Sequence, residues 1–317
     1  MTYIARSGST LLAKELDKYK SIGVTIEDDI PDGLLEGEEV FINNLYELDI
    51  YLDKLFSKPK FQFWNIDREN LRAELENEEY PIDIGIILDK LYKFYFSDSK
   101  YEVGIHKKGR YYLKIDELLK FFPDAKFIHL KRDPRGLFNS QKKSRDSRSG
   151  KLMSNNVVAF ALSYRKMYNI LKSYNKSDYI YSLRYEDLID NFDKEIDAIL
   201  DFLGVTNREK EDLSYYNKIP DPQKELHDNI QQPPLKKRKS GWEKELSALE
   251  IAVLEACLKK EIRKEGYYFS SIKPGNVGWG FRFIHRVSTF YMKYYLAKLV
   301  PGPYKKLKFL KNTIIKR

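Results

Sequence analysis

The stretch from Phe122 to Ser140 reads FPDAKFIHLKRDPRGLFNS and carries the most informative pattern of the chain. Within it, Lys126–Leu130 (KFIHL) is a short apolar run, which predicts a buried strand. The polar residues up to Arg132 end this strand, and a helix is predicted from about Arg135. The stretch therefore predicts a strand, a short loop with a cation, and a helix.

The start of the chain has the same order of elements. A short apolar stretch at Tyr3–Ala5 leads into RSGST at Arg6–Thr10, and Leu11, Leu12 and Leu16 follow at helical spacing. The small residues of this loop can point backbone N–H groups at an anion beside a helix N-terminus. The kinase-type loop G-x-x-x-x-G-K-[ST] is absent from the sequence, which disfavours an enzyme that uses nucleoside triphosphates.

Strands and helices alternate along much of the remaining chain. Further strands are predicted at Ile22–Ile26, Tyr101–Ile105 and Asp178–Leu183. Helices are predicted for two stripes between Glu38 and Tyr95, and for Tyr111–Phe122, Asn155–Ser173, Phe192–Leu203 and Ala248–Glu265. This alternation predicts an α/β fold in which a parallel sheet has helices on both faces, and the polar segment Thr206–Gly241 is predicted to be irregular.

Composition excludes several classes of protein. The chain has 317 residues and a single cysteine, Cys257, so a disulfide scaffold is excluded. The sequence has no apolar run of about 18 to 20 residues, the length that a membrane-spanning helix needs, and Met1–Leu16 does not resemble a secretory signal. We therefore expect a soluble cytoplasmic protein.

The formal charge of +9 is concentrated at the end of the chain. Residues 277–317 hold ten Lys or Arg and no acidic side chain, so the other residues hold 46 basic and 47 acidic side chains. This distribution, with Phe283, Val287, Phe290 and Tyr294 at helical spacing, predicts a basic amphipathic extension of residues 273–317 after a domain of residues 1–272. It does not favour a nucleic-acid-binding protein. The extension is expected either to contact the inner face of a membrane or to dock on the body of the protein.

Four segments together resemble the sulfotransferases that use 3′-phosphoadenosine 5′-phosphosulfate (PAPS). RSGSTLL resembles their 5′-phosphosulfate loop, and Phe122–Ser140 resembles their 3′-phosphate motif. RYEDL at Arg184–Leu188, followed by ILDFLGV, looks like their later strand and helix, and KSGW at Lys239–Trp242 resembles their C-terminal cofactor segment. The resemblance runs from about Tyr3 to Tyr267 and implies a three-layer, P-loop-like α/β fold of the carbohydrate and tyrosylprotein branch. Family members usually have a longer first strand before the loop.

The resemblance also implies a donor site. In the phosphate loop, the groups expected to hold the 5′-phosphosulfate are Arg6 and the backbone N–H groups of Ser7, Gly8, Ser9 and Thr10. Arg132 is expected to pair with the 3′-phosphate through its planar guanidinium, and Ser140 is expected to donate its hydroxyl to the same group. Tyr185 is expected near the adenine, while Lys239 and Ser240 are expected to close over the nucleotide.

Transfer of a sulfuryl group needs a cation near the leaving phosphate. The family carries G-x-K-x-P before the helix that precedes the 3′-phosphate strand, and this sequence reads VGIHKKGRY at Val103–Tyr111. It departs from the pattern by one extra residue before the lysine and by Gly109 in place of proline. Lys107 is the predicted cation, and Lys108 is the alternative.

Glu27 is the predicted general base. It lies 21 residues after Arg6, just past the second strand, where tyrosylprotein and some carbohydrate sulfotransferases keep a catalytic glutamate. The adjacent Asp28 and Asp29 are alternatives, and His106 is a rival because the cytosolic branch uses a histidine from a comparable stretch. No metal site is implied, because the four histidines are scattered.

The resemblance implies a PAPS-dependent sulfotransferase that acts on a hydroxyl or amine, and a carbohydrate or glycolipid is the expected acceptor. The region Phe41–Tyr101 is expected to form part of the acceptor site. Its aromatic residues suit either stacking on an acceptor or packing, and they include Phe61, Phe63, Trp64, Tyr95 and Phe96. The alternatives are a catalytically silent protein that binds a nucleotide or polyanion and, less favoured, a phosphotransferase.

Overall fold

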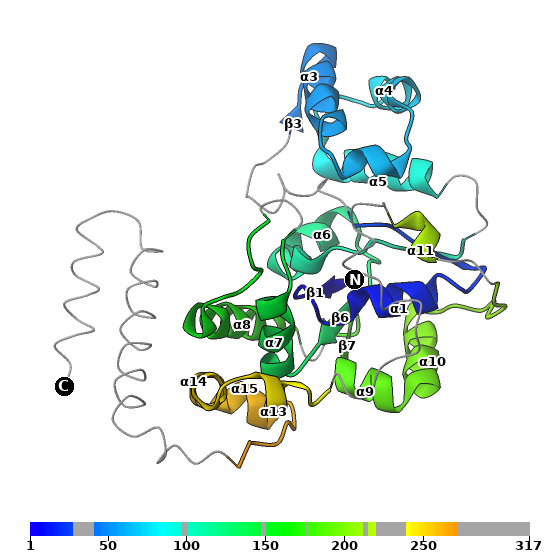
Figure 1. The fold of residues 1–317 in the computed structure, drawn as a ribbon. Coiled ribbons are helices and arrows are strands. Elements are labelled where there is room, and N and C mark those ends of the chain that lie inside the picture. Colours follow the sequence, from blue (N-terminus) through cyan, green and yellow to red (C-terminus); the bar gives the residue numbers. More distant parts are fainter. Residues whose placement is uncertain are drawn as a thin grey trace, which may run out of the picture. The chain divides into compact units, whose positions relative to one another are not determined.

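The computed structural model describes residues 1–27, 41–96, 101–146, 150–174, 177–211, 215–219 and 239–271 (Figure 1). The chain divides into two compact units. The first unit contains residues 1–132 and 170–236, and the second contains residues 133–169 and 237–317. The predicted basic extension and its boundary at residue 272 lie outside the described residues and stay predictions.

A parallel sheet forms the centre of the first unit. Strand β6 (Phe127–Lys131) lies between β1 (Thr2–Tyr3) and β7 (Ile180–Arg184) and is parallel to both. Strand β2 (Ile22–Val24) pairs in parallel with β5 (Val103–Ile105).

The backbone around Met1 connects these two sets of strands. The nitrogen of Met1 donates to the carbonyl of His106 at 2.7 Å, and the N–H of Lys108 donates to the carbonyl of Met1 at 3.1 Å. These bonds place the two-stranded sheet β2–β5 beside β1 of the three-stranded sheet β1–β6–β7. The five strands therefore follow one another in the order β2, β5, β1, β6, β7. The predicted parallel sheet is confirmed.

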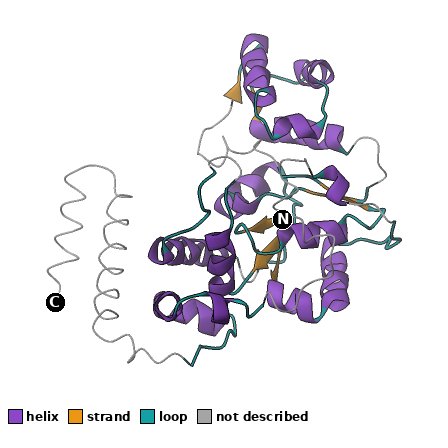
Figure 2. Cartoon of the chain, viewed as in Figure 1, coloured by secondary structure: helices purple, strands orange, loops and turns teal. Residues whose placement is uncertain are grey.

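Helices that follow the strands along the chain pack on this sheet (Figures 1 and 2). They include α1 (Ser9–Leu16), α9 (Tyr185–Asp190) and α10 (Phe192–Leu203). Helix α10 buries Ile196, Ile199 and Leu200, which recur at helical spacing and join one apolar core with residues of all five strands. The first unit also contains the 3-10 helix η2 (Gly109–Leu113), α6 (Ile115–Phe121) and α11 (Tyr215–Lys218).

A mostly helical insertion stands between β2 and β5. Its elements are β3 (Phe41–Ile42), α3 (Leu45–Phe56), the 3-10 helix η1 (Phe61–Trp64), α4 (Arg68–Glu76), β4 (Ile82–Asp83) and α5 (Ile84–Tyr95). The side chains of Asn44, Asp67 and Asp83 cap the three α-helices by accepting backbone N–H bonds.

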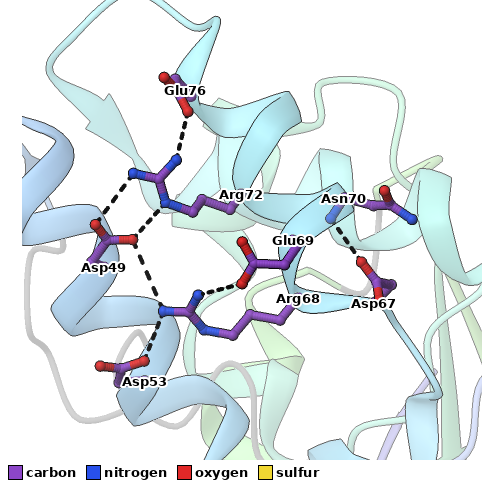
Figure 3. A network of polar contacts seen from close by, with 8 residues as sticks. All are labelled: Asp49, Asp53, Asp67, Arg68, Glu69, Asn70, Arg72 and Glu76. Carbon is purple, nitrogen blue, oxygen red and sulfur yellow. Dashed lines mark hydrogen bonds and ion pairs between the residues drawn. The ribbon is translucent and has the colours of Figure 1, made fainter.

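Ion pairs on the surface of the insertion link α3 to α4 (Figure 3). The guanidinium of Arg72 contacts Asp49 at 2.7 Å and Glu76 at 2.6 Å, and that of Arg68 contacts Asp53 at 2.7 Å. Because these carboxylates are partly exposed to solvent, each pair contributes at most about 1 kcal/mol. Apolar packing is therefore the main stabiliser of the insertion, and Leu48, Leu52, Leu71, Leu75 and Leu88 are fully buried.

The second unit is helical where it is described. Its helices are α7 (Pro134–Lys143), α8 (Val157–Lys172, whose last turn belongs to the first unit), α13 (Trp242–Glu245), α14 (Ala248–Cys257) and α15 (Lys259–Lys264). The side chain of Asp133 caps α7, and Ser247 with Glu250 forms a capping box at the start of α14.

Most predicted elements are present, but several differ from the prediction. The single helix predicted over Ala248–Glu265 is two helices, α14 and α15, and α11 lies in the segment predicted to be irregular. The strand predicted to reach Ile26 ends at Val24. The helix predicted over Tyr111–Phe122 is instead a 3-10 turn followed by α6, separated at Lys114. The antiparallel pair of β3 and β4 was not predicted, because each strand has only two residues and so shows no alternating pattern.

Candidate functional site

The predicted residues of the first unit gather at the carboxyl ends of the parallel strands. Beyond β2, β5, β1, β6 and β7 come, respectively, Glu27, Lys107, the loop at Arg6, Arg132 and Tyr185. In open α/β sheets this edge is where ligands bind. Five residues far apart in the sequence therefore come to lie along one edge.

The loop after β1 has the backbone of an anion-binding turn. Arg6 and Gly8 both have positive φ, at 76° and 94°, and the hydroxyl of Ser7 donates to the carbonyl of Ile4 at 2.7 Å. Helix α1 begins at Ser9, and its N-cap residue is Gly8, which has no side chain to cap the first turn. The first-turn N–H groups and the helix dipole therefore favour an anion at this position.

Tyr185 and Arg132 pack together against this loop. The guanidinium carbon of Arg132 lies 4.5 Å from the centre of the Tyr185 ring, and Nη1 of Arg132 donates to the carbonyl of Arg6 at 2.7 Å. A Cβ added at Gly8 would lie only 2.5 Å from Cδ2 of Tyr185. The loop, the cation and the aromatic ring thus form one packed group.

Lys107 and Glu27 form a second group at the ends of β5 and β2. The side chain of Lys107 is 3% exposed, and burial lowers the pKa of its ammonium; the nearby charge of Glu27 opposes this shift and that of Lys60 adds to it. The Nζ of Lys60 lies 4.0 Å from Oε1 of Glu27. Sequence reasoning missed Lys60, because a lysine before a short turn carries no signal of its partner.

Thr25 holds the ends of β2 and β5 in register. Its N–H donates to the carbonyl of Ile105 at 2.9 Å, and its Oγ1 accepts the N–H of Lys107 at 3.1 Å. The hydroxyl of Tyr215, a buried residue of α11, donates to the carbonyl of Thr25 at 3.0 Å. These bonds fix the backbone that carries Lys107 and leads two residues later to Glu27.

Similarity to known proteins identifies the family of the chain. A model described as the sulfotransferase family matches residues 4–209 of the chain. The chain belongs to the sulfotransferase family. The structure is also similar to that of the sulfotransferase domain from the curacin biosynthetic pathway, with a TM-score of 0.54 and 20% identity over 85% of this chain and 97% of that chain. No curated protein matches the sequence.

These findings confirm the predicted family and its P-loop-like α/β fold, and they assign sulfuryl transfer to this protein in general terms. The branch of the family stays a prediction. Among the described residues there is no helix long and apolar enough to cross a membrane. The same part of the chain shows no cluster of three or more His, Cys, Asp or Glu side chains that could hold a metal ion.

In this sulfotransferase His106 lies within an aromatic cluster. Its Nδ1 hydrogen-bonds with the hydroxyls of Tyr92 and Tyr111, and the edge of its ring packs on Trp64 at a centroid distance of 5.6 Å. These contacts give His106 a packing role, and its role as a base stays a prediction. Asp28 and Asp29, the alternatives to Glu27, lie outside the described residues.

Lys107 and Lys108 are both buried, so burial does not decide which of them is the predicted cation. The charge of Glu27 acts on the ammonium of Lys107. The choice of Lys107 over Lys108 as the catalytic cation stays a prediction.

The remaining predicted donor residues belong to the second unit. Ser140 is half-buried in α7, and its carbonyl accepts the hydroxyl of Ser144 at 2.9 Å. Lys239 and Ser240 directly precede α13, and the carbonyl of Ser240 accepts the N–H of Glu243 at 3.0 Å. Their donor-binding roles stay predictions.

Proposed function

We propose that this sulfotransferase takes the sulfuryl group of PAPS and transfers it to a hydroxyl or amine of a carbohydrate or glycolipid. The order of groups along the sheet edge carries the proposal: carboxylate, buried lysine, phosphate loop, arginine, aromatic ring. This order suits an acceptor at one end, followed by the leaving group, 5′-phosphosulfate, 3′-phosphate and adenine of one donor molecule.

The donor side suits a polyanionic nucleotide. The N-terminus of α1 offers backbone N–H groups, and Arg132, held by the carbonyl of Arg6 and the ring of Tyr185, offers a planar cation. We assign the 3′-phosphate to Arg132 and Ser140, the adenine to Tyr185, and closure over the nucleotide to Lys239 and Ser240. The last two assignments rest on the resemblance of the KSGW segment.

The acceptor side suits proton removal and charge neutralisation. In the proposed step, a bond forms between the acceptor oxygen and sulfur as the bond from sulfur to the 5′-phosphate oxygen breaks. Glu27 takes the proton of the acceptor hydroxyl, and the electron pair of the broken bond stays on the phosphate. The ammonium of Lys107 stabilises that developing charge, and its burial strengthens the interaction because water screens it less.

The aromatic residues of the insertion have two different roles. Phe61 and Trp64 are buried, and Tyr95 accepts the N–H of Ile26 at 3.2 Å, so these residues serve packing. Phe96 packs closely against Gly23 and Gly104 of the β2–β5 pair. Phe63 is 44% exposed. Of the five predicted aromatic residues, Phe63 is therefore our candidate for stacking on a sugar ring.

Calorimetry with the desulfated product, 3′-phosphoadenosine 5′-phosphate (PAP), tests the donor assignment against ATP with magnesium. We expect PAP to bind and Arg132→Ala to weaken it about ten- to a hundredfold, the equivalent of one charge-assisted hydrogen bond. Arg110→Ala is the matched control, because Arg110 is an exposed arginine of the same unit. Equal PAP affinity of Arg132→Ala and the unmodified protein would contradict the assignment, and tighter binding of ATP would favour a phosphotransferase.

Transfer of labelled sulfate from PAPS to glycan, lipid and peptide acceptors tests catalysis. We expect transfer to a glycan or glycolipid, and Glu27→Gln is expected to lower turnover by at least about a hundredfold. The control is Glu69→Gln, which changes an exposed carboxylate of α4. PAP binding without transfer to any acceptor would indicate a catalytically silent binder, and full turnover of Glu27→Gln would remove Glu27 from the mechanism.

Membrane contact through residues 277–317 is a separate proposal, and it rests on their ten basic and no acidic side chains. Flotation with liposomes that contain anionic lipid, with and without these residues, tests it. We expect binding only by the full chain, and equal binding by both forms would exclude this role.

A further inference from the structure

Arg135 is a fully buried cation that the proposed chemistry does not use. Its side chain is 0% exposed, and two carboxylates surround its guanidinium. Nε and Nη2 donate to the two oxygens of Asp133 at 3.0 and 2.7 Å, and Nη1 donates to Glu255 at 2.6 Å. The forked guanidinium therefore links the start of α7 to α14.

Two aromatic rings cover the same guanidinium. Its carbon lies 3.9 Å from the centre of the Trp242 ring and 5.3 Å from that of Tyr268. Trp242 is itself buried and is the first residue of α13, so it directly follows the Lys239–Gly241 segment. A stacked arginine and tryptophan with this separation form a close cation–π contact.

The positive charge of Arg135 is compensated by two carboxylates of the second unit. Burial lowers its pKa, but the hydrogen bonds and charges of Asp133 and Glu255 outweigh burial and leave the pKa above its ordinary value. Glu255 also accepts the N–H and the hydroxyl of Ser270, at 2.8 and 3.0 Å. A cation with all these partners is unsuited to bind a phosphate, so its role concerns the protein around it.

From these contacts we infer that Arg135 is a positioning residue for donor binding. It holds Trp242, and hence Lys239 and Ser240, in a fixed place relative to α7, which carries Ser140. The inference rests on the proposed function, because it assigns Arg135 to the donor-binding segments of that function. Loss of the guanidinium frees the Lys239–Gly241 segment, so donor binding must then order it.

The test compares Arg135→Lys with Lys142→Ala. The first keeps the charge but loses the fork and the flat face that stacks on Trp242. The second removes a partly buried ion pair of the same helix, between Lys142 and Glu250 at 2.7 Å. For Arg135→Lys we expect about a tenfold rise in the PAP dissociation constant and in the donor KM, with kcat and acceptor KM changed less than about twofold. Lys142→Ala is expected to leave all four unchanged.

Hydrogen exchange provides a readout that does not depend on the ligand. Amides of residues 239–246 are expected to exchange faster in Arg135→Lys than in the unmodified protein, and PAP is expected to restore protection. If Arg135→Lys does not fold, Trp242→Leu takes its place in both measurements, with the same expected results.

The outcomes separate the two proposals. Absence of PAP binding by the unmodified protein would overturn the proposed function, whereas faster exchange in the variant would still support the positioning role of Arg135. PAP binding by the unmodified protein and the variant with equal affinity and equal exchange would overturn the inference and leave the proposed function standing. A fall in kcat with no change in donor affinity would also overturn it.

Discussion

Replacing Gly8 by alanine tests the packing of the donor loop. Gly8 has φ of 94°, in the left-handed region that alanine avoids. An added Cβ would lie 2.5 and 2.8 Å from Cδ2 and Cε2 of Tyr185, well inside van der Waals contact. Tyr185 is buried and stacks on Arg132, so its ring has little room to move away.

A second glycine separates the cost of the left-handed backbone from the cost of overpacking against Tyr185. Left-handed backbone costs about 1 to 2 kcal/mol for alanine, and overpacking of a buried site costs about 1 to 3 kcal/mol more. Gly204 at the end of α10 has φ of 79°, but an added Cβ would meet nothing within 4 Å. Gly204→Ala should therefore lower the free energy of unfolding by the backbone cost alone, about 1 to 2 kcal/mol. Gly8→Ala should lower it by both costs, about 2 to 5 kcal/mol.

Urea denaturation of both variants measures the loss of stability, and calorimetry with PAP measures the effect on the site. Displacement of the Tyr185 ring moves Arg132, whose Nη1 otherwise donates to the carbonyl of Arg6 at 2.7 Å. We expect PAP affinity to fall at least about tenfold in Gly8→Ala and to stay unchanged in Gly204→Ala. Equal stability losses and unchanged PAP affinity in both variants would refute the reasoning.

Three further predictions concern Lys107, Thr25 and Glu250. Lys107→Met is expected to lower turnover about a hundredfold, with no loss of stability at neutral pH, because a buried ammonium is removed. Burial lowers the pKa of Lys107, so the unfolded chain binds more protons than the folded protein between that pKa and about pH 10.4. The free energy of unfolding should therefore rise with pH over this range. Urea denaturation should show a smaller rise in Lys107→Met. Thr25→Val removes the acceptor of the Lys107 N–H and should lower kcat about tenfold with an unchanged donor KM in steady-state kinetics; unchanged kcat would exclude the positioning role of Thr25. Burial raises the pKa of Glu250, but the larger opposing effects of Lys142 and Ser247 leave this pKa below its ordinary value. The carboxylate therefore stabilises the fold above about pH 4.3, and this stabilisation is lost as the pH falls through the folded-state pKa. Glu250→Gln should therefore show a weaker acid dependence in thermal melts, and an identical dependence would contradict this prediction.

Several elements were predictable because their signal is local. Phe192–Leu203 is a helix with the predicted bounds, since its apolar residues recur every three to four positions and Gly204 ends it. The strand around Ile128 and the loop–helix after β1 were found for the same reason. The antiparallel β3–β4 pair was missed, because its two-residue strands pair across about forty residues of chain.

The residues of the candidate site were predictable from the sequence, but their contacts were not. Sequence reasoning placed Glu27, Lys107 and Arg132 each just after a strand. It found neither the contact of Lys60 with Glu27 nor the burial of Arg135 between two carboxylates. These partners come from segments that share no pattern with the residues they contact.

The sequence by itself determined the family, the alternation of strands and helices, and the residue type at each strand end, because these features depend on neighbours along the chain. Only the tertiary structure decided which ends lie side by side. The order β2, β5, β1, β6, β7 places Glu27 beside Lys107, and Arg132 and Tyr185 on the other side of the phosphate loop. That order depends on hydrogen bonds between strands far apart in the chain, which no local pattern encodes.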